Sequence, residues 1–235
     1  MGHHLRTNLP CSECSSSDAM VEYDTHFWCF SCQAYISKSG ADRRRAVAPK
    51  EDRIEYPEDL IRDPRQFHVA ALKWLYKYKI FDDQIKLYGI SYLPEVHRVF
   101  IPTKDEKGNL LSYQTRSLSY FDTPKYLGKG SKSLFHSKQA KTTIIVLVED
   151  ALSCIRVGEY LSCVSLQGTS LRTEDIPAIL KYNEILLWLD GDKAGKTASR
   201  KLKKQLSMYK ECTALSTPKD PKEHSRRHIK SLLGV

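Results

Sequence analysis

The chain has 235 residues and carries 37 lysines and arginines against 28 aspartates and glutamates, which gives a formal net charge of +9. This length allows one substantial core plus a small satellite domain, and the positive charge favours an acidic polymer as partner. No segment approaches the ~18 apolar residues of a membrane span and the N-terminus lacks the apolar core of a secretion signal, so we expect no membrane contact and a cytoplasmic location.

Four of the seven cysteines form two CxxC pairs near the N-terminus: Cys11, Cys14, Cys29 and Cys32. Each pair can form a tight turn that presents two thiolates to one tetrahedral ion, and the segment between the pairs has the length of a β-hairpin. In a reducing compartment this pattern favours one structural zinc ion over disulfides or an iron–sulfur cluster. We therefore predict a small β zinc ribbon over residues 1–37 that folds when it binds zinc.

Aromatic side chains lie just before the second cysteine pair. If the four cysteines fill the zinc shell, His26 is free to hydrogen-bond a nucleic-acid base, and Phe27 and Trp28 can stack on bases. The alternative is a structural histidine beside an apolar patch that closes a small core. The residues alone leave both interpretations open.

A polar segment follows the ribbon. Residues 38–58 contain Gly40, an arginine run at 43–45 and prolines at 49 and 57. Such a composition buries too little apolar surface to fold, so we interpret it as a flexible linker.

Residues 59–140 begin with two predicted helices. Phe67, Ala71, Leu75 and Tyr78 recur at helical spacing, with Trp74 beside them. A shorter helix follows in "DDQIKLYG", which we expect Asp82 to cap and Gly89 to end. We interpret both helices as scaffold.

A hairpin and a lysine-rich segment come next. "RVFIPTKDEKGNLLSYQTRSL" places two strand-like runs around a Gly–Asn turn, which predicts a β-hairpin. "TPKYLGKGSKSLFHSKQ" then mixes lysines with glycines, a pattern that suits close approach to phosphates. A solvated loop is the alternative for this second segment.

Residues 141–235 alternate apolar strands with helices. The strand-like runs are "TTIIVLV", "CVSL", "EILLWL" and "CTAL", and continuous apolar strands between helices predict a parallel sheet that is covered on both faces. Working sites of such sheets lie beyond the carboxyl ends of the strands. Acidic residues follow three of these runs: Glu149, Asp190, Asp192 and Asp220.

Asp190 and Asp192 flank one glycine in "LDGD". In an extended segment residues i and i+2 face the same side, and two such carboxylates repel unless a divalent cation lies between them. Glu149 would supply a third ligand from a neighbouring strand, so the pattern favours a Mg²⁺ or Mn²⁺ site. The alternative is a turn in which an aspartate caps the next helix.

These motifs resemble known families. A strand ending in Glu149, followed some forty residues later by a strand ending in DxD, is similar to the Toprim fold. "RSLSYFDTPKYL" and "KDPKEH" resemble segments of bacterial-type primases, and "LPCSECSSSD…DTHFWCFSC" resembles the zinc ribbon of phage primase–helicases. Two positions depart from the pattern, because Ser153 stands where many relatives carry an acid and Lys222 stands where some bacterial relatives do.

The resemblance implies residue roles. Catalysis would involve Glu149, Asp190, Asp192 and Lys125, with Asp220 as a further Mg²⁺ or Mn²⁺ ligand. Nucleic acid and nucleotides would be bound by these residues: Asp24, His26, Trp28, Arg116, Lys125, Lys129 and Lys132.

The expected function is a phage-type DNA primase. It would make short RNA primers de novo on single-stranded DNA from ribonucleoside triphosphates by two-metal phosphoryl transfer. No GxxxxGK[ST] motif occurs, so a separate replicative helicase is the expected partner. A non-catalytic recombination protein that pairs zinc with a Toprim domain and a Toprim nuclease are the alternatives.

Overall fold

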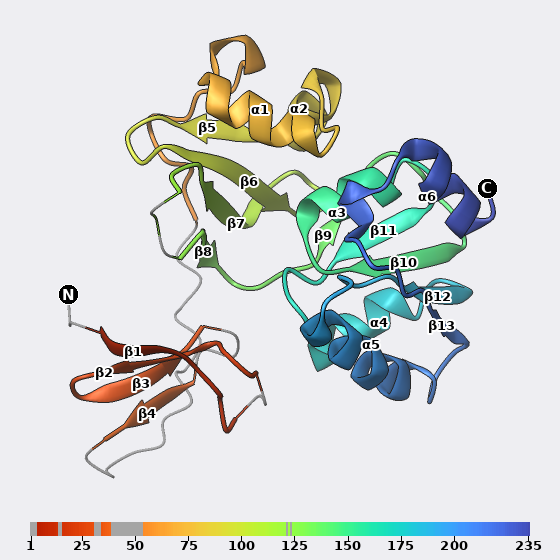
Figure 1. Cartoon of the computed structure of the whole chain (residues 1–235). Helices are drawn as coiled ribbons and strands as arrows, with labels where there is room; N and C mark the ends of the chain where they lie inside the picture. Colours follow the sequence, from red (N-terminus) through yellow and green to blue (C-terminus); the bar gives the residue numbers. More distant parts are fainter. Residues whose placement is uncertain (1–3, 14–15, 31–33, 39–53, 121, 123) are drawn as a thin grey trace. The chain divides into compact units, whose positions relative to one another are not determined.

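The computed structural model describes residues 4–13, 16–30, 34–38, 54–120, 122 and 124–235 (Figure 1). They fall into two compact units, Met1–Arg53 and Ile54–Val235. The architecture is mixed α/β, with an antiparallel N-terminal sheet and a mainly parallel C-terminal sheet. The predicted fold class is therefore confirmed. Within the described residues, no helix is both long and apolar enough to cross a membrane.

The first unit is an antiparallel sheet of four short strands in sequence order. The strands are β1 (His4–Leu9), β2 (Met20–Tyr23), β3 (His26–Cys29) and β4 (Tyr35–Ser37). Cys11 and Cys29, one from each CxxC pair, are buried in the same small core with Met20. Cys14 and Cys32 lie outside the described residues. The hairpin expected between the pairs is present as β2 and β3.

The second unit begins earlier than the sequence suggested. Residues 39–53 of the predicted linker lie outside the described residues, but Tyr56 already packs against the buried side chains of Leu60 and Phe100. The last residues of the expected linker, 54–58, therefore belong to the second unit.

Two helices and an antiparallel sheet open this unit, and Figure 1 draws both helices beside the sheet. The elements are η1 (Pro64–Gln66), α1 (Val69–Lys77), α2 (Asp82–Tyr88), β5 (Ser91–Leu93), β6 (Arg98–Lys104), β7 (Leu110–Ser117) and β8 (Tyr126–Gly130). The sheet order is β5-β6-β7-β8, so the predicted hairpin is the pair β6 and β7.

Both predicted helices are present, with different starts. Phe67 is buried but precedes α1. The N-cap of α2 is Phe81 rather than Asp82, and its backbone N–H donates to the side chain of Gln84 at 2.9 Å. Gly89 ends α2 as predicted, with φ of 67°, a left-handed conformation that a residue without a Cβ adopts without strain.

The lysine-rich segment contains two strands. Residues 126–130 form β8, which pairs antiparallel with β7, and β9 (Phe135–His136) pairs with β11 (Ser162–Ser165) of the other sheet. Every residue of β8 is exposed, so no apolar periodicity marks it in the sequence. Because β9 belongs to the C-terminal sheet, that sheet begins before the predicted boundary at residue 141.

The C-terminal sheet has the strand order β13-β12-β10-β11-β9 and is parallel except for β9. Its other strands are β10 (Ile144–Val148), β11 (Ser162–Ser165), β12 (Glu184–Leu187) and β13 (Cys212–Ala214). Its helices and turns are α3 (Ala151–Val157), η2 (Thr173–Asp175), α4 (Ile176–Ile179), α5 (Lys193–Leu206), η3 (Pro221–Glu223) and α6 (Arg226–Leu233).

Both faces of this sheet are buried, as predicted. Alternate residues of β10 face opposite layers: Val146 and Val148 pack in one core cluster with α3, whereas Ile145 and Leu147 pack in another with α5. Figure 1 shows α3 and α6 on one side of the sheet and α4 and α5 on the other. This layering leaves the carboxyl ends of the strands as the edge on which polar side chains can gather.

Candidate active site

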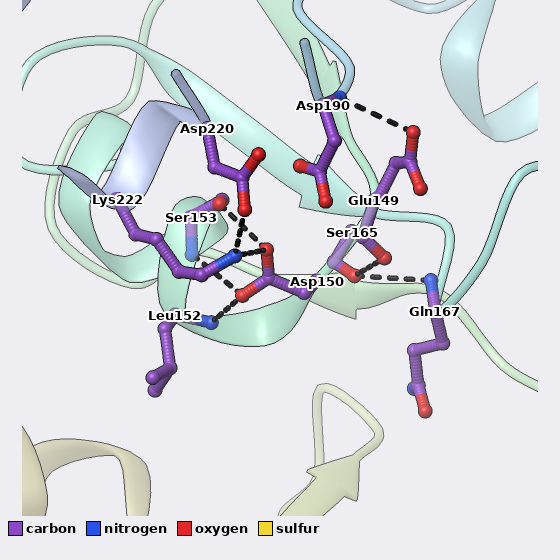
Figure 2. Close-up of polar contacts among 9 residues, drawn as sticks. All are labelled: Glu149, Asp150, Leu152, Ser153, Ser165, Gln167, Asp190, Asp220 and Lys222. Atoms are coloured by element: carbon purple, nitrogen blue, oxygen red, sulfur yellow. Dashed lines mark hydrogen bonds and ion pairs between the residues drawn. The ribbon is translucent and has the colours of Figure 1, made fainter. Parts of the chain in front are cut away.

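Acidic side chains meet at the carboxyl ends of the C-terminal strands (Figure 2). Glu149 directly follows β10, and Asp190 lies three residues beyond β12. The carboxylate of Glu149 accepts a hydrogen bond from the backbone N–H of Asp190 at 3.2 Å. Asp220 follows β13 and precedes η3. The structure thus brings three of the four predicted acids to one edge of the sheet. We call these three acids and the neighbouring Asp150 the acidic edge.

Burial changes the ionisation of two of these acids. Burial and the neighbouring charge of Asp190 raise the pKa of Glu149 to about 7. Burial also raises the pKa of Asp190 to about 7, against the opposing charge of Lys222. The Oδ1 atom of Asp190 is buried and has no hydrogen-bond partner among the described residues. Among the described residues, no cation lies within ion-pairing distance of either carboxylate, although the charge of Lys222 acts on Asp190 from further away.

Two glycines allow this close packing. A Cβ on Gly195 would lie 2.6 Å from Oε1 of Glu149 and 2.3 Å from the carbonyl oxygen of Asp190. A Cβ on Gly191 would lie 2.4 Å from the carbonyl oxygen of Thr217. Only glycine fits at these two positions without movement of the neighbouring backbone.

Asp192 has a different environment from Asp190. Its carboxylate caps α5 by accepting from the backbone N–H of Gly195 at 2.8 Å, and the residue is exposed. The capping alternative that the sequence left open therefore applies to Asp192. Its charge still acts on the acidic edge, since it contributes to the raised pKa of Glu149.

Asp150 and Lys222 form a network at the acidic edge that sequence reasoning missed. Asp150 caps α3 by accepting from the backbone N–H groups of Leu152 and Ser153 at 2.9 and 3.1 Å. Lys222 donates to Asp150 at 3.0 Å and to Asp220 at 2.8 Å. The only signal in the sequence is a lysine inside the acidic motif "KDPKEH".

The donor set suits a hard divalent cation. Carboxylate oxygens are the ligands that Mg²⁺ and Mn²⁺ prefer, and Mg²⁺ is commonly held by one or two carboxylates while waters and phosphates complete its shell. Glu149 and Asp190 fit this description, with the buried oxygen of Asp190 unsatisfied. Within the described residues, no three His, Cys, Asp or Glu side chains form a ready metal cage. Solvent or substrate oxygens would have to complete the shell.

Three of the predicted basic residues lie on or next to the antiparallel sheet of the same unit. The guanidinium of Arg116 lies 5.8 Å from the ring centre of Trp74 and 5.3 Å from that of Tyr126. Arg116, Trp74 and Lys125 line a pocket of about 200 Å³. Lys125 and Lys129 are exposed. Trp74, interpreted from the sequence as scaffold, thus also lines the pocket.

This pocket connects to the acidic edge through aromatic side chains. Trp74 contacts Tyr78 edge to face with the ring centres 5.8 Å apart, and the Lys222 ammonium lies 5.7 Å from the ring centre of Tyr78. Asp150 and Lys222 also act on the hydroxyl of Tyr126 electrostatically. Lys132 lies apart from this group and donates to Ser170 at 3.3 Å.

The ribbon presents its predicted residues on β3 and in the turn that precedes it. His26 is stacked between Tyr23 and Tyr35, with ring centres 4.7 and 4.6 Å away. Asp24 in the turn is exposed, and Trp28 is partly exposed. The stack fixes the ring of His26, and the exposed Asp24 leaves a polar group next to it.

Comparison with known proteins agrees with this architecture. Residues 147–225 match the Toprim-like family. The DNA primase of Buchnera aphidicola is 31% identical over 127 residues, which cover 48% of this chain and 22% of that relative. The match therefore covers less than a quarter of the length of that relative. The resemblance to DNA primases that the sequence motifs predict is confirmed.

Two solved structures share the fold. The zinc-binding and RNA polymerase domains of the Aquifex aeolicus primase align with 100% of this chain and 78% of their own, at 16% identity and a TM-score of 0.61. A DnaG primase catalytic domain bound to single-stranded DNA aligns with 71% of each chain, at 18% identity and a TM-score of 0.59. The second unit thus has the fold of a primase catalytic core.

Proposed function

We propose that the chain is a DNA primase that synthesises short RNA primers de novo on single-stranded DNA from ribonucleoside triphosphates. The observation that carries the proposal is the half-buried pair Glu149 and Asp190 at the edge of a Toprim-like sheet. That pair lies in a unit that also holds a pocket lined by arginine and lysine. The similar catalytic domain bound to single-stranded DNA supports DNA as the template.

The acidic edge would carry the phosphoryl transfer. Mg²⁺ or Mn²⁺, held by Glu149, Asp190 and Asp192, would supply charge neutralisation at the attacking and leaving oxygens of a two-metal transfer. Glu149 and Asp190 would be ionised when the ion is bound, because their repulsion is then compensated. A second ion on the protein would need Asp220, whose carboxylate is already paired with Lys222.

The basic residues would hold the nucleic acid and the nucleotide. Arg116 lies between two aromatic rings, a position from which its planar guanidinium can bind phosphate oxygens in a fixed direction. Lys125, Lys129 and Lys132 would add phosphate contacts that carry no sequence information.

The ribbon would bind one zinc ion and read the template. Cys11, Cys14, Cys29 and Cys32 are the proposed ligands, and the shared core that holds two of them supports this set. Template bases would meet the exposed Asp24, the stacked His26 and the partly exposed Trp28. A separate replicative helicase is the proposed protein partner.

Primer synthesis tests the proposal. Labelled ribonucleotides, Mg²⁺ or Mn²⁺ and a mixed pool of single-stranded DNA templates are supplied to the wild type, Asp190→Asn and Glu106→Gln. Glu106 lies exposed in the β6–β7 turn and serves as the matched control. We expect short RNA products from the wild type and Glu106→Gln but not from Asp190→Asn. A change of preferred template in His26→Ala would identify the ribbon as the reader.

Other outcomes would replace the proposal. Cutting of the DNA by the wild type, lost in Asp190→Asn, would identify a nuclease. Tight DNA binding with neither synthesis nor cutting, also after a replicative helicase is added, would identify a non-catalytic DNA-binding protein.

A further inference from the structure

Lys222 is held between two carboxylates of the acidic edge. Its ammonium donates to Asp150 at 3.0 Å and to Asp220 at 2.8 Å, and its side chain is only 12% exposed. Figure 2 shows the ammonium between the two acids. A lysine ammonium is a compact point charge with three donors, so two carboxylates can share it as they would share a metal ion.

The partners of Lys222 are themselves fixed. Asp150 accepts from two backbone N–H groups at the start of α3 and from the hydroxyl of Ser153 at 2.7 Å. Asp220 is the N-cap residue of η3, the turn that carries Lys222. Lys222 also lies 5.7 Å from the ring centre of Tyr78. The ammonium therefore has a defined position, unlike a surface lysine whose side chain samples many rotamers.

Lys222 pairs directly with only two acids of the acidic edge, although its charge also acts on Asp190. Asp150 and Asp220 have a protein cation between them. Glu149 and Asp190 have none within hydrogen-bond distance among the described residues, and Oδ1 of Asp190 is buried without a partner. The exposed Asp192 has one oxygen engaged in the cap of α5. Unsatisfied oxygen donors thus remain on the side of Glu149 and Asp190.

We infer that Lys222 serves as a built-in cation that takes the place of a second protein-held metal ion at Asp150 and Asp220. The acidic edge then binds one Mg²⁺ or Mn²⁺ by itself, at Glu149 and Asp190. This inference rests on the proposed function, because that function provides the reason for a metal ion at the edge. Any second ion of the transfer then arrives with the nucleoside triphosphate, whose phosphates bind divalent cations.

Lys222 acts in this arrangement as a positioning residue. It would keep the carboxylates of Asp220 and Asp150 paired with its ammonium, so that an ion would have a single place to bind. Removal of the ammonium would leave two carboxylates side by side, and such a pair attracts a divalent cation in place of the lost charge.

Counting bound Mn²⁺ tests the inference without any reaction. The zinc-loaded full chain is titrated with Mn²⁺ near pH 8 in the absence of nucleotide, and unbound Mn²⁺ is measured by electron paramagnetic resonance. We expect one tightly bound ion in the wild type and in Lys222→Arg, two in Lys222→Met, and one again in the double variant Lys222→Met with Asp220→Asn.

A second comparison does not depend on how well Lys222→Met folds. In the wild-type background, Asp220→Asn is expected to keep the single ion with an affinity within about twofold, because Asp220 does not bind it, whereas Asp190→Asn is expected to lose at least tenfold. Two tight ions in the wild type, or loss of the ion in Asp220→Asn, would overturn the inference and leave the primase proposal standing. No bound ion in the wild type would overturn both.

Discussion

The carboxylate of Glu149 accepts a hydrogen bond from the backbone N–H of Asp190 at 3.2 Å, although the two residues lie 41 positions apart in the chain. The parallel pairing of β10 with β12 brings them together, and Gly195 makes the contact possible by leaving room where a Cβ would lie.

Gly195→Ala is expected to destabilise the second unit by about 1–3 kcal/mol, because the new methyl group would overlap Asp190 backbone and the Glu149 carboxylate. Alanine normally stabilises a helix relative to glycine by about 1 kcal/mol, so the expected sign is the reverse of the intrinsic preference. Urea unfolding measures the change. Gly128→Ala is the matched control, since its added Cβ would lie 3.7 Å from the nearest atom, the carbonyl oxygen of Tyr113. A more stable Gly195→Ala would contradict this close packing around Gly195.

The strands and acids of the C-terminal sheet could be predicted because their signals are local. Continuous apolar runs mark β10 and β12, and an acid follows each run. Parallel pairing then places the acids at one edge, whatever the details of packing. The edge of the sheet at which Glu149 and Asp190 lie was therefore predictable from the sequence.

Features that depend on tertiary contacts could not be predicted. β8 is exposed along its whole length, so its sequence has no apolar alternation, and pairing with β7 alone defines it. Lys222 pairs with Asp150 from 72 positions away, a contact that no local pattern encodes. The helical spacing of Trp74 is the same for a residue that supports the core and for one that lies beside Arg116, so the pattern could not reveal the contact with Arg116.

Binding of Mn²⁺ at the acidic edge is expected to strengthen between pH 6 and pH 8. Burial raises the pKa of both Glu149 and Asp190 to about 7, so a proton competes with the ion at pH 6. One such proton weakens the affinity about tenfold at pH 6 relative to pH 8. Titrations followed by electron paramagnetic resonance at both pH values measure the difference. An affinity that does not change with pH would show that neither carboxyl binds the ion.

The same acids are expected to make the Mg²⁺-free protein less stable as pH rises. The pKa of both acids is higher in the folded state than in an unfolded chain, so protonation of these acids stabilises the folded state. This contribution to the free energy of unfolding is lost as pH rises through about 7. Thermal unfolding at pH 6 and pH 8 should show the loss, and saturating Mg²⁺ should reverse it. Asp190→Asn should reduce the dependence, because it removes one of the two acids. An equal dependence in that variant would place the effect elsewhere.

Arg116→Lys is expected to weaken binding of single-stranded DNA about fivefold while it keeps the positive charge. The guanidinium lies between the rings of Trp74 and Tyr126, and an ammonium loses the planar stacking that this position provides, worth about 1 kcal/mol. Fluorescence anisotropy over a series of salt concentrations measures the affinity. The salt slope should stay unchanged, because the charge is retained.

Lys125→Gln provides the contrast with Arg116→Lys. Lys125 is exposed beside the same pocket, so the variant should lose one phosphate contact. The slope of log affinity against log salt should then become less negative by about 0.7. Equal salt slopes for Lys125→Gln and the wild type would mean that Lys125 touches no phosphate.

One zinc ion per chain is expected, and the first unit is expected to unfold without it. Cys11 and Cys29 come from different CxxC pairs and are buried together in an apolar core that, among the described residues, otherwise contains only one buried residue, Met20. So small a core does not hold four strands together by itself. Cys29→Ser should therefore lose the zinc and the protection of amides in β2 and β3 against hydrogen exchange. The second unit has its own two large core clusters, so its amides should stay protected.

Cys212→Ala is the control for the zinc experiment, because Cys212 is a buried thiol of β13 in the second unit. This variant should retain one zinc ion per chain by mass spectrometry of the metal content, together with the protected amides of the first unit. Zinc that stayed bound in Cys29→Ser at the level of Cys212→Ala would place the ion outside the ribbon, and protection of β2 and β3 without zinc would show that the ribbon folds on its apolar core alone.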